Sequence, residues 1–196
     1  MKVTLTDHTL NPEYRIGHEA AICYDSRTDE ASCIKRAVHC RDSGHLATMR
    51  FAYATVAITG ISRVCSHQLV RIAIAGILQE SQRYVKQTNI EWVNPHTLPD
   101  LPDNLQKRWH TLQAQATVLY QDCLDAGMKK QDARYILPQA CSTAINLCMN
   151  FQGFKDFLAN RTSSHAQHEI RQVALEIQRL LNTIAPNIFT LNDQHN

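Results

Sequence analysis

The sequence predicts a single helix-rich α+β domain that spans residues 1–196 and contains few strands. Three observations predict it: several segments carry apolar residues at helical spacing, two stretches have the composition of strands, and no repeat or low-complexity tract divides the chain. With 196 residues, 44% of them hydrophobic, the chain can bury one sizeable core but is short for two independent domains. A small sheet of this kind often needs a partner chain to cover it.

Two strands and two helices are expected in the first 80 residues. Residues 2–6 alternate as a short strand does, and residues 29–41 have helical spacing that ends at Ser43-Gly44. Residues 51–61 are rich in β-branched and aromatic types, which predicts a central strand. Residues 62–77 return to a helical pattern.

The middle of the chain is expected to be a loop followed by helices. Residues 94–103 contain three prolines, which indicates a loop rather than a domain linker because helical sequence resumes directly after it. A long helix then runs to about Ala126 and ends at Gly127, since glycine tolerates the left-handed conformation at a helix end. A short helix over residues 129–137 should stop at Pro138.

The C-terminal part is expected to be mostly helical. Residues 142–160 are predicted to be mostly helical, with a break near Gly153. A final amphipathic helix is expected from Ser164 to about Ile184, with Ser163 or Ser164 as its cap.

Composition argues against several classes of protein. The 20 Lys and Arg residues against 18 Asp and Glu residues give a formal charge of +2, so bulk charge indicates neither a nucleic-acid partner nor a membrane partner. The first residues lack the pattern of a signal peptide, and no apolar run reaches the length of a membrane span. We therefore expect a soluble protein located in the cytoplasm.

Cysteine and histidine patterns indicate no metal site and no disulfide framework. The seven cysteines are odd in number and form no CxxC pair, so we interpret them as reduced thiols that are mostly small core residues. The ten histidines include no HExxH or comparable pair.

Four arginines mark a candidate anion site. Arg71, Arg83, Arg134 and Arg161 lie in segments with apolar or small neighbours, where burial of a guanidinium is costly unless an anion meets it. A phosphate or a planar carbonyl group would suit the paired donors of these side chains. The alternative is that they form internal ion pairs or lie on the surface.

Five segments carry a resemblance to a known family. They are S-H-Q-L-V-R from Ser66 to Arg71, S-Q-R-Y from Ser81 to Tyr84, Gly44-His45, D-A-R-Y-I-L-P from Asp132 to Pro138, and N-R-T-S-S-H-A-Q-H-E-I from Asn160 to Ile170. In their order and spacing along the chain, the segments resemble the flavin-dependent thymidylate synthases.

The resemblance implies a fold, an activity and a set of ligands. The implied subunit is helix-rich around a small, mainly antiparallel sheet, and it assembles as a homotetramer with active sites at subunit interfaces. The implied reaction is the reductive methylation of dUMP to dTMP, with FAD as cofactor and with NADPH and methylenetetrahydrofolate as co-substrates.

The resemblance also implies the residues that bind dUMP. They are Gln68, Arg71, Gln79, Glu80, Ser81, Gln82, Arg83, Arg134 and Arg161. Arg161 is expected to be catalytic, because a guanidinium beside the pyrimidine carbonyl favours the ring deprotonated at N3. No cysteine attacks the ring in this family, and Ser81 is expected to bind ligand rather than to act as a nucleophile.

The flavin positions match the family pattern less closely. The positions implied for FAD are His45, Ala47, Arg71, Ile72, Ala73, Asn150, Gln152, Asp156 and His165. The signature usually reads Arg-His-Arg where this chain has Arg71-Ile72-Ala73, and the Glu-His pair that commonly follows the Gly-His segment is Arg50-Phe51. Leu78 replaces a usual Asn or Glu, and Gln152 and Asp156 are also changed side chains.

Two interpretations of these changes remain open. In one, the chain is an active variant in which backbone groups and relocated side chains such as Arg50 hold the flavin. In the other, it is a paralogue with altered chemistry on a pyrimidine nucleotide, for example hydroxymethylation, or a nucleotide-binding protein without catalysis. RNA binding is disfavoured by the low net charge and by the aromatic content of 7%.

Overall fold

The computed structural model describes residues 1–23, 26–87 and 90–190. Its strands are β1 (Lys2–His8), β2 (Tyr53–Ser62), β3 (Gly76–Gln79) and β4 (Ser142–Asn150). Its α-helices are α1 (Pro12–Ala21), α2 (Glu30–Asp42), α3 (Arg63–Leu69), α4 (Asp103–Asp125), α5 (Lys130–Ala133), α6 (Phe151–Arg161) and α7 (His168–Ile184). Short 3-10 turns are η1 (Leu46–Phe51), η2 (Leu98–Asp100) and η3 (Arg134–Ile136). The predicted helix-rich α+β class is confirmed.

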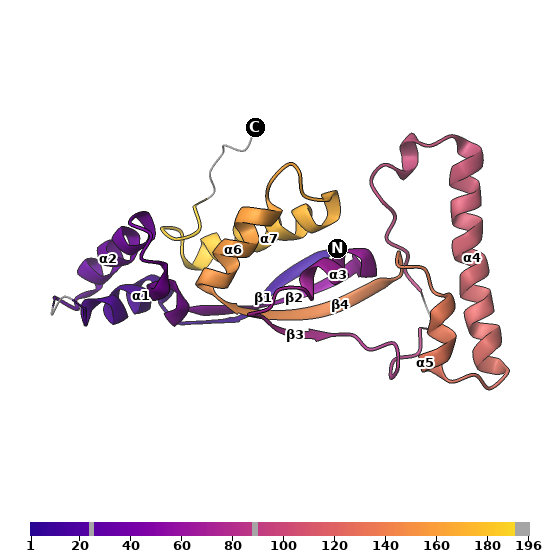
Figure 1. The fold of residues 1–196 in the computed structure, drawn as a ribbon, viewed down its shortest axis with the longest axis horizontal. Coiled ribbons are helices and arrows are strands. Elements are labelled where there is room, and N and C mark those ends of the chain that lie inside the picture. The colour runs from indigo at the N-terminus through magenta and orange to yellow at the C-terminus, as the bar shows by residue number, and fades with distance from the viewer. Residues whose placement is uncertain (24–25, 88–89, 191–196) are drawn as a thin grey trace. The chain divides into compact units, whose positions relative to one another are not determined.

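The strands form one sheet in the order β1-β2-β4-β3 (Figure 1). Hydrogen bonds near the strand ends pair neighbours in opposite directions: Thr9 N to Tyr53 O at 3.1 Å, Phe151 N to Ala52 O at 2.8 Å, Arg63 N to Cys141 O at 3.1 Å, and Glu80 N to Ala144 O at 2.9 Å. The sheet is therefore antiparallel. β2 lies between two other strands, which confirms the central strand expected over residues 51–61.

The chain divides into two compact units, which are described separately here. The first unit comprises Met1, Thr59–Arg71 and Leu78–Ile145, and the second comprises Lys2–Ile58, Ile72–Ile77 and Asn146–Asn196.

The second unit buries a continuous apolar core. On α7, Ile170, Val173, Ala174, Ile177 and Leu181 are buried at helical spacing, so this helix presents one apolar face inward. At the start of α6, the ring of Phe151 meets the ring of Phe189 edge-on, with centroids 4.9 Å apart. In Figure 1, α6 and α7 lie side by side above the strands of this unit.

Helices α1 and α2 of the second unit approach each other at a glycine. A Cβ atom on Gly17 would lie 1.8 Å from the carbonyl oxygen of Cys33, so a larger residue cannot occupy this position without displacing backbone. The guanidinium of Arg36 donates from Nη1 to Gly17 O at 2.8 Å and ties the two helices together. The predicted helix over residues 29–41 is confirmed, whereas α1 was not predicted.

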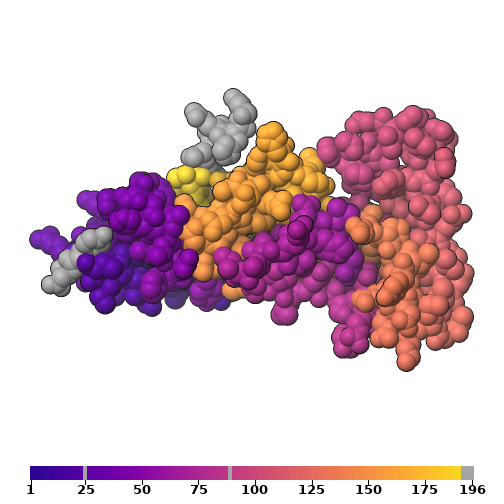
Figure 2. All heavy atoms as spheres, in the orientation of Figure 1, coloured from indigo at the N-terminus to yellow at the C-terminus, as the bar shows by residue number. Residues whose placement is uncertain are grey.

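The first unit contains the long helix α4, which buries few of its side chains. Gln113, Ala116 and Tyr120 are its buried residues. Asn94 Oδ1 accepts from Gln113 Nε2 at 2.9 Å, which anchors the helix to the loop before it. The predicted loop, the long helix and its end at Gly127 are confirmed, and Gly127 has a φ of 91°. Most residues of α4 are exposed on the surface, part of which can be followed in Figure 2.

The helix expected over residues 62–77 is wrong beyond α3. α3 ends at Leu69, and residues from Gly76 onward form strand β3. The reason is that residues 76–79 pair with β4, and this pairing outweighs the weak helical preference of a short apolar run.

The helix expected from residue 142 is also wrong for its first half. Thr143, Ile145, Leu147 and Met149 are buried alternately, which is the period of a strand, and this segment is β4. Residues 151–161 are helical as predicted, but α6 is unbroken at Gly153. A Cβ atom on that glycine would lie 2.9 Å from Cδ1 of Ile74, the end of an exposed side chain that can move aside.

The final helix begins later than expected. α7 starts at His168, and its cap is Gln167, whose Oε1 accepts from Ile170 N at 3.2 Å. Ser163 instead accepts from His165 N at 3.3 Å in the preceding turn, so neither Ser163 nor Ser164 is the cap.

Candidate functional site

The residues expected to bind a nucleotide lie in the first unit, except for Arg161. Gln68 is on α3, Arg71 is in the turn after it, and Arg134 begins η3. The run from Gln79 to Arg83 starts at the last residue of β3 and continues into a turn. Arg161 is the last residue of α6 in the second unit.

Gln79 is held by the strand and the helix beside it. Its Nε2 donates to Ser66 Oγ of α3 at 2.9 Å and to Thr143 Oγ1 of β4 at 3.3 Å. Since both partners belong to regular elements, the start of the run from Gln79 to Arg83 is fixed.

Glu80 is held through both its backbone and its side chain. Its carbonyl oxygen accepts from Arg63 Nη2 at 3.0 Å, and its Oε1 accepts from Gln87 Nε2 at 3.0 Å. Glu80 also lines an open cavity of about 300 Å³, whose wall includes Lys86 and Glu91.

The segment from Ser81 to Val85 forms a tight turn. Ser81 Oγ accepts from Arg83 N at 3.3 Å, and Ser81 O accepts from Tyr84 N at 3.1 Å and Val85 N at 2.9 Å. Gln82 is buried, and its side chain donates to Cys141 Sγ at 3.6 Å. The guanidinium of Arg83 is exposed over the ring of Tyr84, 5.6 Å from its centroid.

The four candidate arginines are less buried than their neighbours in the sequence predict. Arg71 and Arg83 are exposed, which is the surface alternative, and Arg134 and Arg161 are half-buried. Within the described residues, none of Arg71, Arg83 and Arg134 has a carboxylate within 4.0 Å. The guanidinium groups of the first unit therefore keep donors for an anion.

Arg63 belongs to this region and was missed in the sequence. Burial lowers the pKa of its guanidinium, and the positive charge of Arg134 lowers it further, whereas Cys141 and Glu80 oppose the shift. A signal was present: Arg63 is the first residue of a helix, where the helix dipole disfavours a cation. Burial also raises the pKa of the Cys141 thiol, which keeps it protonated.

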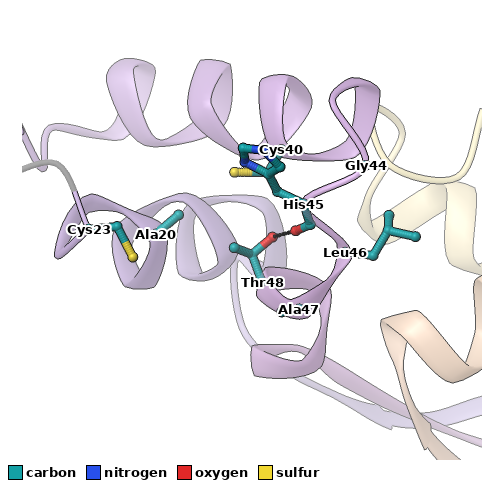
Figure 3. Close-up of a pocket in the computed structure, with 8 residues that line it drawn as sticks. All are labelled: Ala20, Cys23, Cys40, Gly44, His45, Leu46, Ala47 and Thr48. Atoms are coloured by element: carbon teal, nitrogen blue, oxygen red, sulfur yellow. Dashed lines mark hydrogen bonds between the residues drawn. The ribbon is translucent and has the colours of Figure 1, made fainter.

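In the second unit, His45 and Ala47 line a mostly apolar cavity of about 360 Å³ (Figure 3). Its lining residues are Ala20, Cys23, Cys40, Gly44, His45, Leu46, Ala47 and Thr48. Gly44 has a φ of 73° and closes α2, while His45 N donates back to Cys40 O at 2.8 Å. Thr48 Oγ1 donates to His45 O at 2.8 Å, so the Gly44-His45 pair is a helix-ending turn that places His45 at the cavity.

Three further candidates lie at the start of α6. Asn150 caps the helix, because its Oδ1 accepts from Gly153 N at 2.9 Å. Gln152 Nε2 donates to Asp156 Oδ1 at 2.7 Å. The Oε1 atom of Gln152 is buried without a hydrogen-bond partner, which leaves an acceptor unsatisfied.

Lys155 lies between Gln152 and Asp156 and was missed in the sequence. It is half-buried, and no carboxylate within the described residues lies within 4.0 Å of it. Burial lowers its pKa, Arg41 lowers it further, and Asp42 and Asp156 oppose the shift.

The remaining flavin candidates are in turns. Ile72 is half-buried and Ala73 is exposed in the segment between α3 and β3. His165 is exposed between α6 and α7, and Arg50, which was considered as a relocated group, is exposed on η1.

Cysteines and histidines form no metal cluster in the described part of the chain. Four of the seven cysteines, all free thiols, are buried: Cys33, Cys40, Cys65 and Cys141. Of the described helices, none is long and apolar enough to cross a membrane.

Comparisons with known proteins cover nearly the whole chain. Residues 4–187 match the family described as thymidylate synthase complementing protein. A flavin-dependent thymidylate synthase of Thermococcus onnurineus (strain NA1) is 35% identical over 95% of this chain and 80% of the relative. Enzymes of the same name from Pyrococcus furiosus and Geobacter sulfurreducens are 36% and 33% identical, over 89% and 96% of this chain and 76% and 85% of the relatives.

Proposed function

We infer, since this chain belongs to the thymidylate synthase complementing protein family, that it is a flavin-dependent thymidylate synthase. Its reaction is the reductive methylation of dUMP to dTMP, with FAD as cofactor and with methylenetetrahydrofolate and a reduced nicotinamide nucleotide as co-substrates. The observation that carries this function is the segment from Gln79 to Arg83, which is fixed by hydrogen bonds beside guanidinium groups that lack carboxylate partners.

The dUMP phosphate is assigned to the first unit. Arg71, Arg83 and Arg134 offer charged donors, and Ser81 adds a hydroxyl group in the turn beside them. Gln79 and Glu80 act mainly by fixing the backbone of that turn, and Gln82 contributes backbone only. Gln68, half-buried on α3, completes the set.

Ring activation is assigned to Arg161. This half-buried arginine ends α6, where the carbonyl ends of the helix favour a positive charge and help to fix it. A guanidinium held against the pyrimidine carbonyl stabilises the ring that has lost its N3 proton, and so increases electron density at C5. The buried, protonated Cys141 has no part in this chemistry.

The residues of the second unit fit a flavin. The cavity at His45 and Ala47 is apolar and suits a flat ring, and Gln152 offers an unpaired buried acceptor. Lys155 supplies a half-buried cation three residues after Gln152. Ile72 and Ala73, which stand in place of the usual His and Arg of the signature, supply no charge. When bound, FAD supplies the hydride chemistry that side chains cannot, while the protein orients it and excludes water.

A homotetramer is the proposed assembly. On α4, Leu105, Leu112 and Leu119 repeat every seven residues and are 39%, 60% and 46% exposed, which is the spacing of a helix seam that meets another chain. Active sites at subunit interfaces follow from the same proposal. Leu112→Glu should reduce the particle to dimers or monomers in sedimentation analysis, with Leu10→Glu, an exposed leucine outside α4, as the control. A tetramer unchanged by Leu112→Glu would place the seam elsewhere.

Two measurements on the purified protein test the function. The visible spectrum should show bound FAD and should change when dUMP is added. Tritium should be released from dUMP labelled at C5 only when methylenetetrahydrofolate and a reductant are present. Binding of dUMP without tritium release would indicate a nucleotide-binding protein instead, and a hydroxymethyl product on chromatography would indicate altered chemistry.

A further inference from the structure

Arg63 occupies a position that joins the helix α3 to the nucleotide segment. Its backbone N donates to Cys141 O at 3.1 Å, so its main chain is tied to the start of β4. Its side chain turns to the other neighbour and donates from Nη2 to Glu80 O at 3.0 Å. One residue thus connects α3, the approach to β4 and the Gln79 to Arg83 segment.

The Glu80 carbonyl, which accepts from Arg63, lies where the backbone of that segment is held most firmly. Glu80 N bonds to Ala144 O at 2.9 Å, and the next residue, Ser81, begins the turn that presents Arg83. Of the bonds to the Glu80 backbone, the one from Arg63 comes from a charged donor, which is the stronger kind. Loss of it would free the peptide between Glu80 and Ser81 to rotate.

In the described part of the chain, no carboxylate pairs directly with Arg63, although the charge of Glu80 partly offsets that of its guanidinium. The described residues place no carboxylate within 4.0 Å of its guanidinium, and its Nε is buried without a partner. Arg134, which is assigned to the phosphate, adds a second positive charge close enough to disfavour the charged form of Arg63. Two such cations gain stability when an anion joins them.

We propose that Arg63 is a positioning residue of the nucleotide site, which fixes the Glu80 carbonyl and adds an unpaired positive charge beside Arg134. The proposal rests on the assignment of dUMP to this segment. Arg63 acts through Glu80 and Arg134 rather than by touching the reacting atoms, and it explains why a cation stands at the start of a helix.

The test compares Arg63→Met and Arg63→Lys by calorimetric titration of the FAD-loaded protein with dUMP. Arg63→Met removes both the hydrogen bond and the charge, and the Kd for dUMP should rise about tenfold. Arg63→Lys keeps the charge without the planar fork and should rescue part of the loss, to a rise of about threefold. The Kd for FAD should not change in either variant.

Arg36→Met is the matched control. Arg36 is also half-buried and also donates to backbone carbonyls, those of Gly17 and Arg27, but it belongs to the second unit. It should lower the melting temperature while leaving the Kd for dUMP unchanged.

A wild-type Kd for dUMP in Arg63→Met would overturn the proposal. If that variant does not fold, a wild-type Kd in Arg63→Lys overturns it equally, since the fork geometry would then be dispensable. Failure of the wild-type protein to bind dUMP at all is a different result, because it removes the nucleotide assignment itself.

Discussion

The two units of this chain differ in the partners that their polar and charged side chains have. In the first unit, Gln79 and Glu80 are satisfied by neighbours, and Arg71, Arg83 and Arg134 are left without carboxylates. In the second unit, Gln152 and Asp156 bond to each other across one helical turn. The first unit therefore leaves these arginines available to an anion, whereas in the second unit the side chains of Gln152 and Asp156 bond to each other on one helix.

The two units also differ in how closely their residues match the family pattern. The arginines and Ser81 that the resemblance assigns to the nucleotide in the first unit keep side chains able to bind a phosphate. The changed flavin positions Ile72, Gln152 and Asp156 lie in the second unit, whose fold is determined by close contacts such as Gly17 against Cys33. A scaffold with a complete core tolerates exchange of the side chains that hold a cofactor, provided other groups near them take over.

Arg161→Ala is the substitution expected to have the largest effect. It tests whether the residues that act on dUMP belong to the first unit alone. Arg161 is the one residue assigned to dUMP that lies in the second unit. Removal of its guanidinium should lower tritium release from C5-labelled dUMP by about 10²- to 10³-fold, because charge on the ring is no longer stabilised. Sedimentation should show an unchanged assembly.

Arg161→Lys serves as the comparison, since it keeps charge without paired donors and should recover only part of the activity. Tritium release at the wild-type rate in Arg161→Ala would show that ring activation belongs to the first unit alone.

Ala73→Arg is expected to have an intermediate effect on the flavin side. Ala73 is exposed in a turn, so an arginine can be accommodated there, and it restores a charge that the family signature usually carries. The Kd for FAD, measured by fluorescence quenching, should fall about tenfold, while the Kd for dUMP stays constant. Ala73→Met adds length without charge and is the control; equal tightening by both would mean that packing, not charge, limits flavin binding.

Parts of the fold could be read from local sequence because their causes are local. Gly44 and Gly127 end helices in the left-handed conformation, and the β-branched run in β2 favours a strand wherever it lies. β4 was misread because Ala, Leu and Met also suit a helix, and only the alternating burial of Thr143 to Met149 reveals the strand. That burial depends on β2, which is distant in sequence.

The candidate site shows the same limit. The five matched segments predict which residues bind the ligands, because that prediction needs only residue type and spacing. Arg63 and Lys155 were noticed through neighbours that folding brings to them: Glu80 is 17 residues from Arg63, and Arg41 is far from Lys155 in the chain. Sequence patterns carry no record of such contacts, so burial and hydrogen bonding had to reveal them.

Lys155→Met is expected to have the smallest effect and to sharpen the picture of the flavin side. Burial and Arg41 lower the folded-state pKa of Lys155 below 10.5, with Asp42 and Asp156 opposing. Between the lowered pKa and 10.5 the unfolded chain binds more protons, so wild-type stability should rise with pH relative to Lys155→Met. The difference in unfolding free energy, from urea midpoints at neutral and alkaline pH, should stay below about 1 kcal/mol because solvent screens a half-exposed charge.

If Lys155 meets an anionic part of FAD, the difference should shrink when FAD is bound, because the anion restores the charged form. A pH dependence identical with and without FAD would assign the cation that holds the flavin to another residue, such as Arg50.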